Sequence, residues 1–334
     1  MHNKIYNKTA ENFRKAAFNS TTNRFIEPKN KSAPKNNNEN YNNNYNNKNY
    51  NGYNNFEDKL NTYQNLSKLK EWSVKNFNEY NIWIEPFLGS GIVALNVPSQ
   101  FKHIICADIN PYIISFYRGI QNGYITSEKV REFLKYHQEM FAKSEEGGYA
   151  HYRCVKDEFN KTKDIYLFLL LTRTSFNGIM RFNKKGEWNV PYCKVQNRLT
   201  DKLIDEICNN IDEIYNVIIS RDYTFVNVPY ELIIKQWKRR RAVIYADPPY
   251  LGLNVNYFDS WDLEREEKLY ELLKDNNFIL STWLNNGEKG NDVVKKFGEN
   301  FNIKEIPHKY FVAAKTDGRK NIVEGLIYNK NAQV

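Results

Sequence analysis

The sequence has few of the residues that bind metals or form disulfides. It holds four cysteines and five histidines in 334 residues. The cysteines (Cys106, Cys154, Cys193 and Cys208) lie far apart and form no CxxC pair, and the histidines show no metal-ligand spacing. This pattern predicts no metal site and no disulfide framework, and it favours reduced thiols in an intracellular protein.

Long hydrophobic runs are also absent. No stretch approaches the ~18–20 apolar residues that a membrane-spanning helix needs. The N-terminal sequence MHNKIYNKTAENFRKAAFNS lacks the apolar core of a signal peptide. We therefore expect a cytoplasmic protein with no membrane partner.

Acidic residues are fewer than basic ones, 39 against 48, which gives a net charge of +9. This balance fits a polyanionic partner such as nucleic acid. The apolar fraction of 41% excludes a wholly disordered chain. The length allows one large catalytic domain and a smaller partner domain.

Four segments can be distinguished along the chain. Residues 1–55 contain the run NNNENYNNNYNNKNYNGYNN, which cannot form a core, and we predict that this segment is disordered. Residues 56–123 and 224–334 are expected to form the two parts of a catalytic domain. Residues 124–223 are interpreted as a mostly helical insertion between them.

Short apolar runs predict the strands of a parallel sheet that is buried on both faces. The runs are NIWIEPFLG, KHIICADIN, RAVIYADPPY and NFILSTW. Helical patterns follow two of them, PYIISFYRGI and WDLEREEKLYELLKD, so strand and helix alternate and predict a doubly wound α/β fold. The insertion holds three amphipathic helical patterns, EKVREFLKYHQEMF, KDIYLFLLLTRT and LTDKLIDEICNNIDEIYNVI.

The first motif is EPFLGSG at residues 85–91, between a predicted strand and a helix expected over IVALNV. Glycines at such a turn let a ligand approach the backbone, and a helix N-terminus favours an anionic group. Asp108 ends the next strand, where such folds place the acid that binds ribose hydroxyls. A structural turn explains a lone Gly-x-Gly equally well. A nicotinamide oxidoreductase is the least favoured alternative, because the turn reads GSGIVA and not GxGxxG.

The second motif is Asp247-Pro248-Pro249-Tyr250, at the end of another predicted strand. The amino nitrogen of adenine is a poor nucleophile because its lone pair is delocalised into the ring. Acceptors on its hydrogens, from the Asp carboxylate and a Pro carbonyl, can draw it toward tetrahedral geometry for methyl transfer. Prolines preorganise these acceptors, and Tyr250 can stack on a base extruded from the duplex.

The third motif is RTSFNGIMRFNKKGEWNVPY at residues 173–192, where basic, amide and aromatic residues interleave in a loop with two glycines. Arg can bond guanine bidentately, Asn can read adenine edges, and Phe can wedge into a base step. The alternative for this segment is a solvated hairpin.

In this order the motifs resemble those of the Dam-type, alpha-class DNA adenine methyltransferases, over roughly residues 56–329. The resemblance implies a Rossmann-like methyltransferase sheet with an inserted target-recognition domain. It further implies site-specific methyl transfer from S-adenosylmethionine (AdoMet) to adenine N6 in duplex DNA by base flipping. The expected setting is restriction–modification or phage or host DNA protection.

The site residues that we assign on this basis fall into three groups. The AdoMet-binding group is Glu85, Pro86, Phe87, Gly89, Ser90, Gly91, Asp108, Ile109, Asn227 and Asp247. The catalytic group is Asp247, Pro248, Pro249 and Tyr250. The DNA-binding group is Arg173, Phe176, Asn177, Arg181, Asn183, Lys184, Lys185, Asn189 and Pro191. The expected partners are double-stranded DNA, AdoMet and a cognate restriction endonuclease, and we expect a monomer or weak dimer.

Two departures from the family pattern leave alternatives open. The usual N-terminal Gly-Gly-Lys type motif is not intact, with KNKSAPK (29–35) or YQNLSKLK (63–70) as stand-ins. Where the family often has an acid before DPPY, this chain has Asn227. The alternatives are methylation of RNA adenine or of cytosine N4, and a catalytically inactive DNA-binding regulator. The large insertion favours duplex DNA, because specific RNA targets are mostly single-stranded.

Overall fold

The computed structural model describes residues 80–183, 185–194, 198–237, 241–251, 261–285, 290–309 and 321–329. The predicted disordered segment 1–55 and both stand-ins for the lysine motif lie outside the described residues. Lys184, one of the predicted DNA contacts, lies outside them as well.

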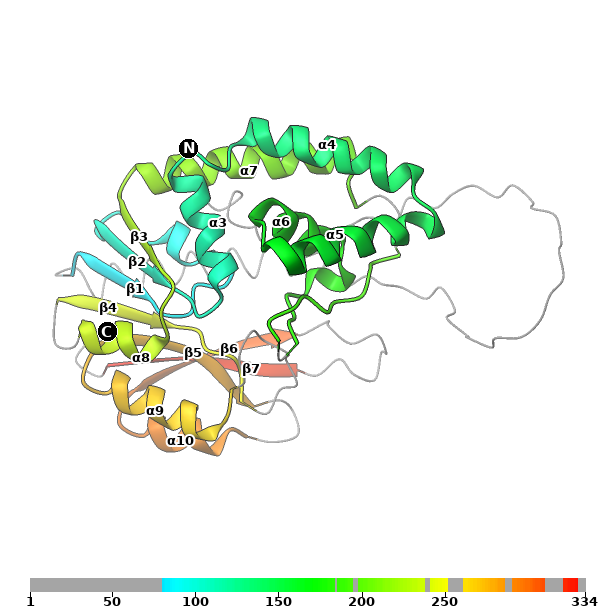
Figure 1. Cartoon of the computed structure of the whole chain (residues 1–334). Coiled ribbons are helices and arrows are strands. Elements are labelled where there is room, and N and C mark those ends of the chain that lie inside the picture. The colour runs from blue at the N-terminus through cyan, green and yellow to red at the C-terminus, as the bar shows by residue number, and fades with distance from the viewer. Residues whose placement is uncertain are drawn as a thin grey trace, which may run out of the picture.

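The central layer is a seven-stranded sheet with the order β3-β2-β1-β4-β5-β7-β6 (Figure 1). Its strands are β1 Ile82–Glu85, β2 His103–Ala107, β3 Asp222–Val226, β4 Ala242–Ala246, β5 Asn277–Asn285, β6 Asn302–Lys309 and β7 Asn321–Tyr328. β1 to β5 pair in parallel, whereas β7 runs antiparallel to both β5 and β6. From β1 the chain builds the sheet to one side and then returns to β4 on the other. This doubly wound arrangement confirms the predicted α/β fold.

The central strands bury side chains on both faces, as the apolar runs predict. Trp83, Val243 and Ile279 belong to one core cluster, and their strand neighbours Ile84 and Ile244 belong to the other. The first cluster is covered by α3 (Pro111–Gln121) and by the helical insertion. The second is covered by α8 (Tyr230–Gln236), α9 (Leu263–Leu273) and α10 (Asp292–Gly298), on the opposite side of the sheet (Figure 1).

Four helices lie between α3 and β3: α4 Ser127–Lys143, α5 Tyr149–Thr162, α6 Ile165–Thr174 and α7 Asp201–Ile219. Thr126, Asp164 and Thr200 cap the N-termini of α4, α6 and α7 by accepting backbone N–H groups. α6 is buried from Phe168 to its end, so it is the internal helix of the insertion.

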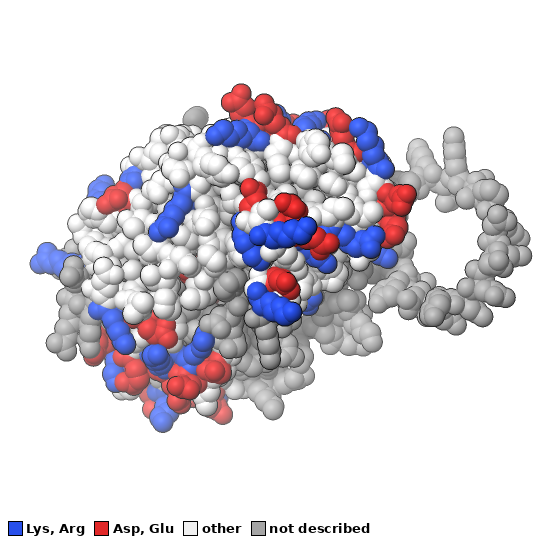
Figure 2. Space-filling view, viewed as in Figure 1, with Lys and Arg blue, Asp and Glu red and all other residues white. Residues whose placement is uncertain are grey.

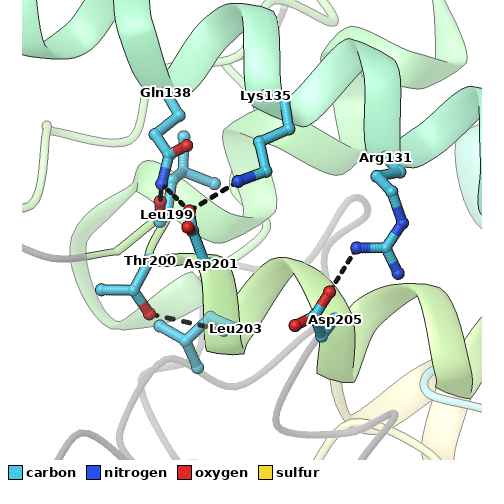
Figure 3. Close-up of polar contacts among 8 residues, drawn as sticks. All are labelled: Arg131, Lys135, Gln138, Leu199, Thr200, Asp201, Leu203 and Asp205. Carbon is cyan, nitrogen blue, oxygen red and sulfur yellow. Dashed lines mark hydrogen bonds and ion pairs between the residues drawn. The ribbon is translucent and has the colours of Figure 1, made fainter.

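α4 and α7 lie side by side and are joined by polar contacts (Figure 3). Lys135 Nζ bonds Asp201 Oδ1 at 2.7 Å, Arg131 pairs with Asp205, and Gln138 Nε2 donates to the Leu199 carbonyl at 2.6 Å. The two ion pairs are exposed, so solvent screens them and they add little to stability.

One local prediction is wrong. The expected helix over IVALNV is only a short 3-10 turn, η2 (Ala94–Asn96). Pro98 explains this, because a proline disfavours helical backbone in the residue before it, and Val97 is extended with ψ 138°. The glycine turn is therefore not followed by a helix N-terminus that could bind an anion.

Candidate active site

The glycine turn after β1 is tied to β2 and contains two glycines in left-handed conformations. The Leu88 N–H donates to the Ala107 carbonyl at 2.9 Å. Gly89 has φ +49° and Gly91 has φ +65°. Among the described residues, a Cβ on Gly89 would meet no atom within 4 Å, whereas one on Gly91 would lie 2.3 Å from Tyr117 Oη. The first glycine thus leaves an open backbone face, and the second makes room for a tyrosine.

Asp108 links the glycine turn to the end of β2. Its Oδ2 accepts the Gly89 N–H at 2.9 Å and its Oδ1 accepts the Asn110 N–H at 2.8 Å. The side chain is 8% exposed, and burial raises its pKa to about 6, against the lowering effect of these two bonds. Asn227 Nδ2 donates to the carbonyls of Asp108 and Ile109 at 2.8 and 3.0 Å. These hydrogen bonds of Asp108 and Asn227 therefore join the ends of β1, β2 and β3.

The first residues of the motif lie in the interior. Glu85 is only 2% exposed and Pro86 is buried. Burial raises the pKa of the Glu85 carboxyl, a hydrogen bond from Trp83 Nε1 opposes this, and the nearby Asp247 carboxylate raises it further. The side chains of Glu85 and Pro86 are thus placed below the surface on which a ligand would lie.

Phe87 leaves the turn on the opposite side and joins an aromatic group. Its ring stacks on Tyr230 at 5.3 Å between centroids and meets Trp261 edge-on at 5.5 Å. Tyr230 begins α8 and Trp261 precedes α9, so neither belongs to a short motif that could have predicted the contact.

The DPPY segment emerges beside the glycine turn, because β4 pairs in parallel with β1. Asp247 is exposed, Pro248 is buried, and Pro249 and Tyr250 are partly buried. Tyr250 Oη donates to Glu324 Oε1 on β7 at 3.2 Å. Trp283 Nε1 on β5 donates to the Leu251 carbonyl at 3.1 Å. β5 and β7, which lie beyond β4 in the sheet, therefore each hold this segment through one of these hydrogen bonds. No pattern in the sequence predicts either contact.

The third motif forms an irregular hairpin after α6, with isolated bridges Ser175–Tyr192 and Phe182–Trp188. Trp188 is buried and its Nε1 donates to Ser175 Oγ at 3.1 Å. Phe182 stacks on Tyr112 of α3 with centroids 5.3 Å apart and planes at 17°. The hairpin is thus anchored to the insertion by Trp188 and to the catalytic domain by Tyr112.

The predicted DNA contacts in this hairpin differ in exposure. Arg173 is 4% exposed at the end of α6, which argues against the predicted contact with DNA. The physical reason is that α6 is an internal helix, whose last turn is covered by the rest of the insertion. Asn183 is a turn residue, because its Oδ1 accepts the N–H groups of Lys185 and Glu187 at 2.9 and 3.0 Å.

The remaining residues of this group lie at or near the surface. Arg181 donates from Nε and Nη2 to the side chain and the carbonyl of Asn189, both at 2.8 Å. Phe176 is 41% exposed, and Lys185, Asn189 and Pro191 are exposed. The side chain of Asn177 lies outside the described part of the structure.

Over α5 and the hairpin, Figure 2 shows lysines and arginines with acidic side chains among them. The acidic residues of these segments are Asp157, Glu158, Asp164 and Glu187. The basic residues are Arg153, Lys156, Lys161, Lys163, Arg181 and Lys185. Lys163 Nζ donates to the Gly186 carbonyl at 3.0 Å and so joins α5 to the hairpin.

The comparison with known protein families decides between the remaining alternatives. The model of the D12 class N6 adenine-specific DNA methyltransferases matches residues 66–312. The chain belongs to this family. It is therefore an enzyme that methylates the amino nitrogen of adenine in DNA, which confirms the interpretation of the motifs and favours it over RNA, cytosine and hydride transfer.

Individual relatives align with different shares of the chain. A type II methyltransferase, M.MjaIII, of Methanocaldococcus jannaschii is 31% identical over 289 residues, which span 80% of this chain and 95% of the relative. M.CviBI of a Paramecium bursaria Chlorella virus is 27% identical over 63% of this chain and 79% of the relative. The DNA adenine methylase of Escherichia coli K12 is 28% identical over 57% of this chain and 65% of the relative.

Membership of the family implies a methyl donor and a DNA substrate. None of the described helices is long and apolar enough to cross a membrane. Within the described residues, no group of three or more His, Cys, Asp or Glu could hold a metal ion.

Proposed function

We propose that the methyl donor is AdoMet and that it binds across the ends of β1, β2 and β3. The open face of Gly89 supports this, since a Cβ at that position would have no atom of the described residues within 4 Å, and the described backbone therefore leaves space for a ligand. Asp108 would accept the ribose hydroxyls, because each carboxylate oxygen can accept further bonds beside its backbone partner. AdoMet, when bound, supplies an electrophilic methyl group on a sulfonium.

In this proposal, Asn227 takes the place of the acid that family members often have before DPPY. Its amide nitrogen is used by two carbonyls at the end of β2. The amide oxygen would then be the acceptor for the amino group of the cofactor's adenine. Ile109, which is 42% exposed, would provide apolar contact with that ring.

The target adenine would be held by the DPPY segment. The exposed Asp247 carboxylate would accept one amino hydrogen and the Pro248 carbonyl the other. The nitrogen would then face the methyl group that AdoMet supplies, and the proton that the nitrogen loses on transfer would leave to solvent past the exposed Asp247 carboxylate. Asp247 stabilises the positive charge that develops on the nitrogen. Tyr250 would stack on the base once it has left the duplex.

The recognition surface would be the hairpin and α5. Arg181, with Asn189 fixing its guanidinium, is suited to a bidentate contact with guanine. Phe176 would insert into a base step, and Lys185 with the basic residues of α5 would contact phosphates. The two named type II relatives favour a restriction–modification setting with a cognate endonuclease. Expression in a methylation-free host, followed by sequencing for N6-methyladenine, would give the recognition sequence.

The observation that carries the proposal is the pairing of β1 with β4, which brings Asp247 beside the glycine turn. In the test, Asp247→Ala should lower methyl transfer by ~10²–10³-fold while the protein still binds AdoMet and duplex DNA. Glu267→Ala, at an exposed carboxylate on α9, is the matched control and should keep wild-type activity. Binding is measured by calorimetry and DNA shift, and transfer by a radiolabelled methyl group.

Two outcomes would contradict the assignment in different ways. Near wild-type transfer by Asp247→Ala would remove its catalytic role. Loss of AdoMet binding would move Asp247 from the target base to the cofactor.

A further inference from the structure

Glu324 is a partly buried carboxylate in the middle of β7. It lies opposite Trp283 of β5 and Ile306 of β6 in the antiparallel ladder. Glutamate is depleted in strands, and a carboxylate that loses water needs a polar partner. A glutamate at this position therefore calls for a specific explanation.

One partner that the structure gives it is the tyrosine of the DPPY segment. Tyr250 Oη donates to Glu324 Oε1 at 3.2 Å, across 74 positions of sequence. The pKa of Tyr245 on β4 is raised by burial first, then by the charges of Asp247 and Glu85, and to a smaller extent by the charge of Glu324. Both observations place the Glu324 carboxylate at the end of β4, where the target base would bind.

β7 is held against β5 by the antiparallel ladder, and the residue after Glu324 makes room for a side chain of β5. A Cβ on Gly325 would lie 2.7 Å from Cδ2 and Cγ of Leu284, so glycine at this position accommodates the Leu284 side chain. On β5, Trp283 Nε1 holds the Leu251 carbonyl, one residue beyond Tyr250. The backbone after Tyr250 and the hydroxyl of Tyr250 are thus held by two adjacent strands.

We propose that Glu324 is a positioning residue that holds the Tyr250 ring in place for stacking on the extruded adenine. Rotation about the Cα–Cβ bond of a tyrosine carries the ring between three staggered positions. A hydrogen bond at Oη, at the far end of the ring, favours the one position in which Oη reaches Glu324. This inference rests on the proposed stacking role of Tyr250 and extends the target-base site to β7.

The test compares Glu324→Ala, Glu324→Gln and Tyr250→Phe in steady-state kinetics on the duplex that carries the recognition sequence. Loss of the hydrogen bond should raise KM for DNA about 5–10-fold in Glu324→Ala and in Tyr250→Phe, the effect of one hydrogen bond. In both, kcat should stay within about twofold of wild type and the Kd for AdoMet should be unchanged. Glu324→Gln should restore KM to within about twofold, because its amide oxygen accepts the same bond.

A double variant and a control separate positioning from general destabilisation. Tyr250→Phe with Glu324→Ala should raise KM no more than either change alone, because both remove one and the same bond. Glu305→Ala, at an exposed carboxylate of β6 opposite Gly325, should leave KM unchanged. A 2-aminopurine at the target position should fluoresce less in complexes of wild type and Glu324→Gln than of Glu324→Ala, because stacking on Tyr250 quenches it.

The results distinguish failure of this inference from failure of the proposed function. If Tyr250→Ala raises KM for DNA but Tyr250→Phe and Glu324→Ala do not, Tyr250 stacks without help from Glu324 and the inference is overturned. Multiplied effects in the double variant, or no rescue by Glu324→Gln, overturn it as well. If even Tyr250→Ala leaves KM unchanged, the stacking role itself is wrong.

Discussion

The two glycines of the turn after β1 should respond to the same substitution in opposite ways. Alanine at Gly91 must adopt φ +65°, which costs ~1–2 kcal/mol for an L-residue. Its Cβ would also lie 2.3 Å from Tyr117 Oη and 2.8 Å from Tyr117 Cζ, and overpacking of this kind costs ~1–3 kcal/mol. The displaced ring would lose its bond to the Ser90 carbonyl, now 2.7 Å, and its stack on Phe225.

These effects together predict that Gly91→Ala lowers the free energy of unfolding by about 3–5 kcal/mol. Gly89→Ala should lower it by only ~1–2 kcal/mol, because only the backbone strain remains. The alanine methyl group in Gly89→Ala would occupy the open face proposed for the cofactor. The Kd for AdoMet should therefore rise more than ~10-fold, which corresponds to a loss of about 1.4 kcal/mol in binding free energy.

Urea unfolding and calorimetric AdoMet titration on both variants provide the test. Tyr117→Phe, combined with Gly91→Ala, should recover part of the lost stability, because it removes the closest contacting atom. The packing argument is refuted if Gly91→Ala is as stable as Gly89→Ala. Normal AdoMet binding by Gly89→Ala would show that the ligand does not approach this face.

Two further predictions concern the cofactor acid and the hairpin. Burial raises the pKa of Asp108 to about 6 from 3.8, so its contribution to the unliganded fold is greatest at low pH and is lost as pH rises through about 6. Ribose hydroxyls favour the charged carboxylate, so AdoMet should bind more weakly below pH 6. Binding near pH 6 should release a proton from Asp108. Calorimetry in two buffers should detect this proton release for the wild type and not for Asp108→Asn. Arg181→Ala should lower discrimination between cognate and near-cognate sites by ~1–3 kcal/mol, whereas Lys185→Ala should weaken binding to all sequences and reduce its salt dependence. Competition assays across salt concentrations measure both, and an unchanged cognate ratio in Arg181→Ala would contradict the base contact.

The strands that the sequence predicts are those that the sheet buries on both faces. β1, β2, β4 and β5 are confirmed because each is a continuous apolar run. The edge strands β3 and β6 are not visible in this way. β3 alternates exposed and buried residues and β6 carries charges, as a strand with a partner on one side only allows. Periodicity alone does not separate such segments from loops.

The motifs predict where the site lies but not what holds it. Asp108 and Asp247 follow strands in the sequence, and parallel strands bring such ends to one edge of the sheet. Tyr117 lies 27 positions from Ser90, whose carbonyl it bonds, and Glu324 lies 74 positions from Tyr250, so the motifs do not predict either contact. The motif also does not predict burial. Arg173 belongs to a motif of DNA-binding character, yet it is buried because it lies at the end of the internal helix α6.

The place of the insertion in the chain explains how the hairpin is oriented over the site. α3 begins three residues after Asp108, and Asn110 Oδ1 caps it by accepting the Tyr112 N–H at 3.0 Å. The Tyr112 ring then contacts Phe159 of α5 and Phe168 of α6 at 5.1 and 5.6 Å, as well as Phe182 of the hairpin. One aromatic side chain thus joins the segment that bears the cofactor acid to three parts of the insertion. The first turn of α3 therefore contributes directly to the position of the hairpin relative to Asp108.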